Sequence, residues 1–203
     1  MNINLILYLS VYLLAGIPFG YLLAKQFAGV DIKNAGSNNI GATNVLRVVK
    51  ETDEKLAKKL GAATLLLDAI KGVVVILVAK MLGAPESVQW TIAVLAVIGH
   101  CFSVFLYFEG GKGVATAFGV LLLMMPIPAF VAFAFWAFSA KVLKVSSLSS
   151  LIALIAFIIA SYVLYPEVPG IGSHSPIWII AFIIFYKHIP NIVRIFKKEE
   201  SKV

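Results

Sequence analysis

Charge and cysteine are scarce in this chain, and each scarcity excludes a class of protein. Charged residues make up 13% of the 203 residues, against about a quarter in an average soluble domain. Hydrophobic residues make up 61%, so we predict an integral membrane protein whose core is the interior of a helix bundle. The one cysteine, Cys101, excludes an intrachain disulfide, and no cluster of cysteine and histidine indicates a metal site.

The N-terminal apolar stretch lacks the marks of a cleaved signal peptide. No basic residue precedes residues 3–23, and no A-x-A site follows them. The stretch is long enough to cross a hydrocarbon core of about 30 Å, so we expect a retained helix. A net charge of +7 is compatible with nucleic-acid binding, but the placement of the basic residues favours a positive-inside bias. We therefore expect a lipid bilayer, and no nucleic acid, as the partner.

Seven apolar segments follow one another, which predicts an all-α, polytopic transmembrane helix bundle of about seven spans. The short fourth and fifth segments flank Pro126 and Pro128, so five spans plus a re-entrant hairpin is the alternative. Basic residues between alternate segments put the N-terminus outside and the C-terminus in the cytoplasm. Without a visible repeat, residues 1–203 are expected to form one domain. The segments cover residues 2–24, 61–82, 88–108, 113–125, 127–140, 148–165 and 175–187.

Two polar blocks interrupt the hydrophobic sequence on the predicted cytoplasmic side. The first, NAGSNNIGATNVLR, places Arg47 one helical turn after Thr43 and Asn44. Small residues let a backbone approach a phosphate closely, and a guanidinium offers the phosphate a planar pair of donors. An ordinary polar loop with a helix N-cap at Thr43 or Asn44 is the alternative. The candidate phosphate ligands in this block are Gly36, Ser37, Asn38, Thr43, Asn44 and Arg47.

The second block, GHCFSVFLYFEGGKGVATAFG, carries the more specific pattern. Gly110, Gly111, Lys112 and Gly113 join two apolar helices, and Gly113 opens the second of them. Backbone amides at a helix N-terminus beside an ammonium group favour an anion. The GxxxxGK[ST] spacing of a nucleoside triphosphatase is absent. A lysine that extends to the membrane interface without binding a ligand is the alternative.

Four polar residues lie within or at the end of predicted spans. Asp68 and Lys71 are three residues apart and are expected to pair, and ionisable residues inside a membrane are candidates for function. His100 and Ser103 have the spacing of a nucleophile pair. Because no acid is placed to orient the histidine, a histidine that packs against a neighbouring loop is favoured.

Polar residues also mark the ends of the last two segments. The serine run at 146–150, which includes Ser149 and Ser150, opens the sixth segment and could cap the helix or meet a ligand. His188, Asn191 and Arg194 follow one another at helical spacing near the cytoplasmic end of the last segment. A histidine there could act as a base, bind an anion or anchor the helix at the interface.

Taken together, the two blocks and KHIPNIVR (residues 187–194) resemble the three signature motifs of the bacterial acyl-phosphate:glycerol-3-phosphate acyltransferase family (PlsY). LDAIKG (residues 67–72) matches as well, so the resemblance covers almost the whole chain. It implies acyl transfer from an acyl phosphate to the 1-hydroxyl of glycerol 3-phosphate, giving lysophosphatidic acid and phosphate. The implied location is the bacterial inner membrane, with the active site facing the cytoplasm. The H-x4-D motif of acyl-CoA-using families is missing, because Phe105 stands where the acid would be.

The resemblance also implies direct transfer, because an acyl phosphate is already activated. No cofactor, metal or acyl-enzyme is then needed, and a monomer suffices. Either His188 or a phosphate oxygen of the donor can accept the proton of the attacking hydroxyl. The alternative from another class is a transporter or channel for phosphate or organic phosphates, which the lack of repeated halves disfavours. The expected catalytic residues are Ser37, Arg47, Lys112, His188 and Asn191. The residues expected to bind substrate are Gly36, Asn38, Thr43, Asn44, Asp68, Lys71, His100, Ser103, Gly110, Gly111, Gly113, Ser149, Ser150 and Arg194.

Overall fold

The computed structural model describes residues 3–202, and every regular element in that range is helical. The predicted all-α fold is therefore confirmed. The α-helices are α1 (Ile3–Gly16), α2 (Phe19–Ala28), α3 (Ala42–Val49), α4 (Glu54–Met81), α5 (Glu86–Cys101), α6 (Val114–Met124), α7 (Pro126–Leu143), α8 (Ser146–Leu164) and α9 (Ser175–Phe196), and a short 3-10 helix, η1 (Val104–Leu106), follows α5.

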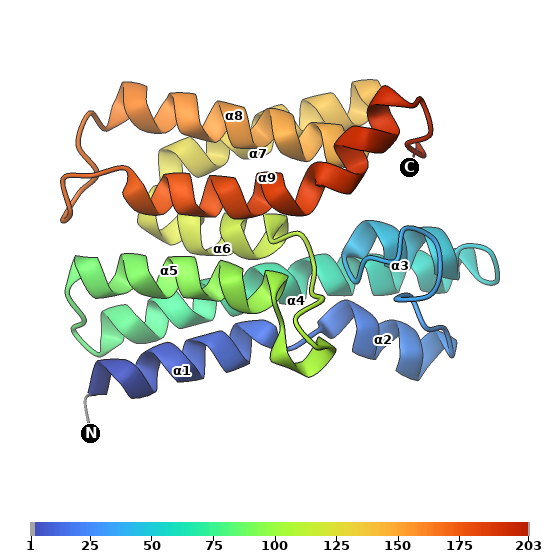
Figure 1. The fold of residues 1–203 in the computed structure, drawn as a ribbon, viewed down its shortest axis with the longest axis horizontal. Coiled ribbons are helices and arrows are strands. Elements are labelled where there is room, and N and C mark those ends of the chain that lie inside the picture. Colours follow the sequence, from blue (N-terminus) through green and yellow to red (C-terminus); the bar gives the residue numbers. More distant parts are fainter. Residues whose placement is uncertain (1–2, 203) are drawn as a thin grey trace.

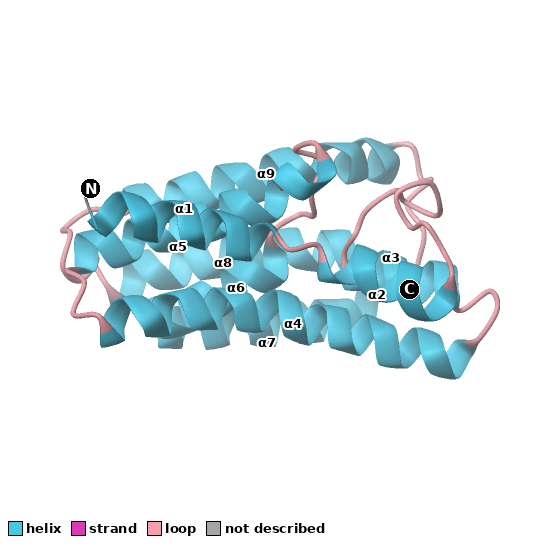
Figure 2. Ribbon diagram, turned by 90° about the horizontal axis from the view of Figure 1, so that it is seen from below, coloured by secondary structure: helices cyan, strands magenta, loops and turns pink. Residues whose placement is uncertain are grey.

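The long helices lie roughly parallel to one another along the length of the molecule (Figure 1). Helices α7, α8 and α9 form one side of the bundle, α1, α4 and α5 form the other, and α6 lies between the two sides. The N-terminus lies at one end of the bundle, whereas α2, α3 and the C-terminus lie at the other end. Figure 2 shows the same separation from below, with the loops around α3 gathered at the end where α4 begins.

Within residues 3–202, six helical segments are long and apolar enough to cross a membrane. The remaining apolar helix, α6, has 11 residues. At 1.5 Å per residue this corresponds to about 16 Å, against a hydrocarbon core of about 30 Å. The predicted count of seven spans thus depends on whether α6 crosses the bilayer, and it stays a prediction. The six segments are Asn4–Ala28, Glu54–Met81, Glu86–Leu106, Pro126–Leu143, Ser146–Leu164 and Ser175–Phe196.

The first apolar segment is helical and long enough to cross a membrane, as predicted, but it is divided into two helices. Pro18 stands between α1 and α2, where its ring is incompatible with an uninterrupted helix. Backbone groups freed by such a break must be satisfied by other groups inside a membrane protein. The Ser103 hydroxyl donates to the Gly16 carbonyl at 2.6 Å, and the Lys71 ammonium donates to the Ile17 carbonyl at 3.1 Å. Both donors are buried.

Helix α4 begins seven residues before the predicted start of its apolar segment at residue 61. Its N-cap is Asp53, whose carboxylate accepts from the Leu56 amide at 2.9 Å. The Glu54 and Lys58 side chains pair at 2.8 Å across the first turn. These charged residues extend the helix beyond its apolar part.

A separate apolar cluster positions the first polar block. It includes Ile32 and Ile40 from the loop before α3, Val45 and Val49 from α3, and Leu60 from α4, all buried. Burial of apolar side chains on both sides of the block holds its polar residues in place.

Candidate active site

A cavity of about 460 Å³ lies between α3, α4, α6, α7, α8 and α9. One part is polar and draws on both sequence blocks and on the last helix, and the other part is apolar. The polar lining includes Ser37, Asn39, Thr43, Asn44, Arg47, Asp68, His100, Lys112, Ser146, Ser147, Ser150, His188, Asn191, Glu200 and Ser201. The large apolar lining residues, which we call the apolar arm, are Leu65, Leu66, Phe118, Leu121, Phe133, Trp136, Leu154, Phe157 and Ile184.

Asn44 organises the first polar block from within. Its side-chain oxygen accepts from the Ser37 amide at 2.8 Å, and the residue is 2% exposed. Its side-chain nitrogen lies within hydrogen-bond distance of three backbone carbonyls, those of Ile32, Ala35 and Asn39, which share its two N–H donors. Asn44 lines the cavity, but these bonds commit its amide to the loop. A buried amide satisfied in this way fixes the loop conformation.

Gly36 and Asn38 turn this loop and do not line the cavity. Their φ angles are 62° and 56°, in the left-handed region. A side chain on Gly36 would overlap the Asn44 carboxamide, so glycine is required there for both reasons. The structure therefore does not bring these two predicted phosphate ligands to the site.

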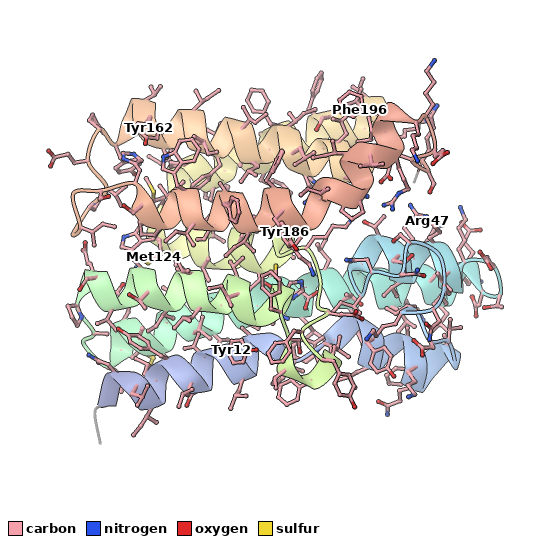
Figure 3. All side chains as sticks on the ribbon, in the orientation of Figure 1. Tyr12, Arg47, Met124, Tyr162, Tyr186 and Phe196 are labelled. Carbon is pink, nitrogen blue, oxygen red and sulfur yellow. The ribbon has the colours of Figure 1, made fainter. Side chains whose placement is uncertain are left out.

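Helix α3 presents Thr43 and Arg47 to the cavity. The helix begins after Gly41, which makes no side-chain capping bond, so the alternative of an N-cap at Thr43 or Asn44 is wrong. The Thr43 hydroxyl lies 3.1 Å from the Ser146 hydroxyl at the start of α8. Figure 3 shows Arg47 extending from α3 toward the end of the molecule where α9 terminates. No acid in residues 3–202 forms an ion pair with Arg47.

A buried charged cluster lies behind the glycine loop. The Lys71 ammonium is 2.9 Å from the Asp68 carboxylate and 2.8 Å from Nδ1 of His100, so the predicted Asp68–Lys71 pair is confirmed. The Gly111 amide donates to the His100 carbonyl at 3.0 Å. A Cβ on Gly111 would overlap the His100 imidazole, so the loop packs directly against this ring. Asp68 and His100 also line the cavity.

Four residues in and near the glycine loop that are predicted to bind substrate do not line the cavity. They are Lys71, Ser103, Gly110 and Gly111. Lys71 and Ser103 bond to the broken first segment, and this explains why they are polar. Ser103 does not bond to His100, so the nucleophile pair is not formed. The amides of Gly110 and Gly111 donate back to the carbonyls of Cys101 and His100, so neither amide is free for an anion. The expectation that all four contact substrate is not supported.

Gly113 and Lys112 end the loop at the cavity. Gly113 is the N-cap of α6 with a φ of 83°, a conformation that favours glycine. Lys112 is half-buried and forms no ion pair or hydrogen bond with the part of the chain that the structure describes. Burial lowers the pKa of Lys112 to about 8, because the opposing effect of Glu200 is smaller than burial and nearby cations add to the lowering.

His188 and Asn191 offer hydrogen-bond acceptors to the cavity. Nδ1 of His188 donates to the Ile184 carbonyl at 2.7 Å, because a carbonyl can only accept. In the neutral ring Nε2 is therefore an acceptor. The side-chain oxygen of Asn191 is buried and has no partner among the described residues, whereas its nitrogen donates to Glu200 at 2.5 Å. A ligand that donates hydrogen bonds fits this pair of acceptors.

The serine run divides between helix and cavity. The hydroxyls of Ser149 and Ser150 donate to backbone carbonyls four residues earlier, at 2.9 Å each. Ser150 lines the cavity and Ser149 does not. The Ser147 hydroxyl donates to Glu200 at 2.7 Å. Ser147 belongs to the serine run that could meet a ligand, whereas Glu200 is not among the predicted site residues.

Glu200 is not recognisable as a site residue in the sequence, because it follows a basic run and resembles part of a solvated tail. The Arg194 guanidinium donates to Glu200 at 2.7 Å and does not itself line the cavity. The sequence offers one signal, an acid six residues after Arg194 just past the end of an apolar helix. Only the direction of the chain after α9 reveals the contact.

The comparison with known proteins identifies the family. The family model for glycerol-3-phosphate acyltransferase matches residues 5–198. The chain belongs to the glycerol-3-phosphate acyltransferase family. The resemblance seen in the motifs is thereby confirmed. Curated glycerol-3-phosphate acyltransferases from Campylobacter lari and Nitratiruptor sp. are 57% and 55% identical to it, over 200 and 202 residues. The alignments cover 98% of each chain for the first, and 100% of this chain and 97% of the relative for the second.

Two solved structures resemble the whole fold. Both are crystal structures of PlsY (YgiH), an integral membrane glycerol 3-phosphate acyltransferase. The glycerol 3-phosphate form matches with a TM-score of 0.84 and 33% identity, covering 98% of this chain and 95% of that chain. The lysophosphatidic acid form matches with a TM-score of 0.80 and 32% identity, covering 98% and 94%. At this likeness, the chain is an integral membrane acyltransferase with the same helical architecture.

Proposed function

We propose that the cavity is the site at which this acyltransferase moves a fatty acyl chain from an acyl phosphate to the 1-hydroxyl of glycerol 3-phosphate. The products are lysophosphatidic acid and phosphate. The observation that carries the assignment of the cavity is that Arg47 and Lys112, two cations without an acid partner in residues 3–202, share it with an apolar arm. Phosphate groups suit the cations, and an acyl chain suits the arm.

The apolar arm has an opening suited to a lipid. Leu65 and Leu66 on α4 and Phe133 on α7 line the cavity, yet they are 47%, 60% and 50% exposed. Because they lie on helices that can cross a membrane, their exposed faces are expected to contact acyl chains of the bilayer. An acyl phosphate can therefore enter laterally while glycerol 3-phosphate enters from the aqueous side.

The reaction needs positioning more than covalent participation. The 1-hydroxyl oxygen attacks the acyl carbonyl carbon, the bond from that carbon to the phosphate oxygen breaks, and phosphate leaves. We assign the hydroxyl proton to an oxygen of the donor phosphate, which lies close to the carbonyl by covalent construction. Arg47 and Lys112 offset the negative charge of the two substrates. Correct orientation of two bound reactants supplies on the order of 7–11 kcal/mol of the barrier.

His188 and Asn191 then orient glycerol 3-phosphate. Its hydroxyls are hydrogen-bond donors, and Nε2 of His188 and the side-chain oxygen of Asn191 are the matching acceptors. His188→Gln and Asn191→Ala should raise the KM for glycerol 3-phosphate, with measurable turnover of His188→Gln at saturation. His174→Gln, at the start of α9, serves as the control. Loss of turnover in His188→Gln at saturating, normally bound substrate would make the histidine the base instead.

The setting of the reaction is a multi-pass protein of the bacterial inner membrane with its active site toward the cytoplasm. The basic residues at the end that holds α2, α3 and the C-terminus support this orientation. The proposed unit is a monomer formed by one domain, and the convergence of Arg47, Lys112 and His188 from distant segments on one cavity supports it.

One experiment tests the reaction and the competing transporter function together. Purified protein is incubated with an acyl phosphate and glycerol 3-phosphate, and lysophosphatidic acid and phosphate are measured. The protein is also reconstituted into sealed vesicles to measure phosphate flux. We expect acyl transfer without flux, and no acyl adduct by intact-protein mass spectrometry during turnover. Flux without transfer would establish a transporter, and an adduct at Cys101 or Ser103 would exclude direct transfer.

A further inference from the structure

The chain turns back on itself after α9 and returns Glu200 to the cavity. Lys198 has a φ of 60°, and its amide donates to the Ile195 carbonyl at 3.0 Å. The Glu199 amide donates to the Arg194 carbonyl at 2.8 Å. This pair of bonds around a left-handed residue is the Schellman motif that ends many helices. The motif directs the next residue, Glu200, toward the side of α9 that faces the cavity.

Three donors from two helices meet at the Glu200 carboxylate. Ser147 on α8 and Asn191 on α9 donate to Oε1 at 2.7 and 2.5 Å, and Arg194 donates to Oε2 at 2.7 Å. The Glu200 side chain is 10% exposed. Burial raises the pKa of this carboxyl, but the three hydrogen bonds together outweigh burial and hold it below its usual value. The group is therefore an anion at neutral pH.

The same donors suit a phosphate group. A hydroxyl, an amide nitrogen and a guanidinium are typical ligands of phosphate oxygens, and the carboxylate occupies them as another oxyanion. Glu200 also lines the cavity that contains Arg47 and Lys112. Glutamate and phosphate thus compete for one set of donors within one site.

The charge balance argues against a permanent Glu200 contact. The two substrates bring a phosphate each, about −1.5 to −2 per group at neutral pH. Arg47 and Lys112 alone offset about half of that charge, and Glu200 adds another negative charge. When Glu200 leaves, Arg194 becomes a third cation available to the substrates. Within residues 199–202, the contacts of Glu200 are the only side-chain hydrogen bonds, so its release disrupts little else.

We propose that Ser147, Asn191 and Arg194 form a phosphate subsite, and that Glu200 occupies this subsite in the substrate-free protein until a phosphate group displaces it. The inference rests on the proposed function, since it places the subsite in the acyl-transfer cavity. It adds a tethered competitor that belongs to the protein itself. Affinity for phosphate-bearing substrates is then set in part by the C-terminal segment.

The first test measures binding without turnover. The Kd of inorganic phosphate is determined by calorimetry on the full-length protein in detergent, for wild type, Glu200→Ala and Glu199→Ala. The last variant removes the same charge from an exposed neighbour and is the matched control. We expect Glu200→Ala to bind phosphate at least threefold more tightly and Glu199→Ala to match wild type. An unchanged or weaker affinity in Glu200→Ala overturns the proposal.

Steady-state kinetics then identify which substrate uses the subsite. A lower KM for glycerol 3-phosphate in Glu200→Ala assigns the subsite to that substrate, and a lower KM for acyl phosphate assigns it to the donor. Unchanged values for both, in an enzyme that turns over, reject competition and leave the proposed function intact. If Glu200→Ala binds phosphate more tightly but the wild-type protein shows no acyl transfer, the displacement of Glu200 is supported and the proposed function is rejected.

A spin label provides a readout that does not depend on the stability of the Glu200 variant. Lys202→Cys is exposed and carries the label in a Cys101→Ala background. Saturating inorganic phosphate should increase the mobility of the label, because displacement of Glu200 frees the tail. A label whose spectrum does not change while phosphate binds would overturn the displacement.

Discussion

At the scale of single residues, the isolation of Arg47 and Lys112 is the feature most informative about function. Both line the cavity, and neither has an acid partner within residues 3–202. Lys187 is a nearby cation that also lacks an acid partner, but it lies over the Phe102 ring and does not line the cavity. A half-buried charge without a partner costs free energy, and a bound anion recovers part of it. Their charge is therefore available for substrate. The lysine and arginine side chains that do pair are Lys33 with Glu109, Lys58 with Glu54, Lys71 with Asp68 and Arg194 with Glu200.

Arg47→Ala and Lys112→Ala should each reduce turnover at least tenfold while the protein stays folded. A hydrogen bond to a charged group contributes about 1.5–3 kcal/mol, and about 1.4 kcal/mol corresponds to a tenfold change. Acyl transfer and thermal unfolding are measured on the same preparations. Lys50→Ala, at the exposed C-cap of α3, is the control and should match wild type. Wild-type rates in both test variants would mean that neither cation meets a phosphate.

The pH profile should report the charge on Lys112. A lysine whose pKa lies at about 8 is charged at pH 7 and loses its proton as the pH rises through that value. We expect kcat/KM to fall above pH 8, to about a tenth of its plateau one unit higher, because this parameter reports groups of the free enzyme. Lys112→Arg keeps its charge in this range and should show no such fall. A parallel decline in both proteins would assign the titration to another group.

At the scale of elements, the glycine loop depends on what lies behind it. Lys71 holds the broken first segment and the His100 ring together, and Gly111 packs on that ring. Lys112 follows directly, so its position depends on a chain of contacts that runs from α4 through α5 to the loop. A buried ion pair that loses one partner typically costs about 3–5 kcal/mol. We therefore expect this cluster to hold Lys112 in position, whereas Lys71 itself does not line the cavity.

Gly111→Ala should raise the KM for both substrates several-fold. The added methyl group would overlap the His100 imidazole, so the loop must move and carry Lys112 with it. Steady-state kinetics with each substrate varied in turn measure the effect. Gly83→Ala is the control for destabilisation away from the cavity, because alanine at its φ of 67° strains the turn between α4 and α5 while no atom lies within 4 Å of its Cβ, and its KM values should match wild type. Unchanged KM values for Gly111→Ala would reduce the loop to a simple connector between helices.

At the scale of the whole molecule, the fold separates an apolar bundle from a polar end. The helices α2 and α3, the first polar block and the end of α9 gather where the cavity has its polar lining. A lipid substrate and a water-soluble substrate must meet in one place. A cavity with an apolar arm in the bundle and cations near its polar end provides such a place.

Cysteine labelling tests the predicted topology. In a Cys101→Ala background, a membrane-impermeant maleimide applied to intact cells should label Gly83→Cys and leave Lys50→Cys unlabelled. Ile127→Cys decides the number of spans, because it lies in the first turn of α7, directly after α6. Labelling from outside supports seven spans, whereas protection there, with labelling at Gly83→Cys, supports five spans and a hairpin. Labelling of Lys50→Cys alone would reverse the predicted orientation.

Local pattern accounts for most of what the sequence predicted correctly. Apolar runs identified helices, because a chain segment in the hydrocarbon core must satisfy its backbone hydrogen bonds within itself, and a helix does so. Spacing also predicted the Asp68–Lys71 pair, because residues three apart share one face of a helix. Arg47, Lys112, His188 and Asn191 could be selected as polar residues in an apolar chain, and all four line the cavity. Their catalytic roles remain predictions.

Tertiary contacts decided what local pattern could not. Lys71 and Ser103 look like ligands in the sequence, but they donate to carbonyls at the helix break next to Pro18, and those partners lie 54 and 87 residues away. Glu200 looks like part of a solvated tail, yet the turn at Lys198 buries its carboxylate among donors from two helices. Helical spacing therefore determines which residues share a face. Only the packing of distant segments determines whether that face meets a ligand, a broken helix or the end of the same chain.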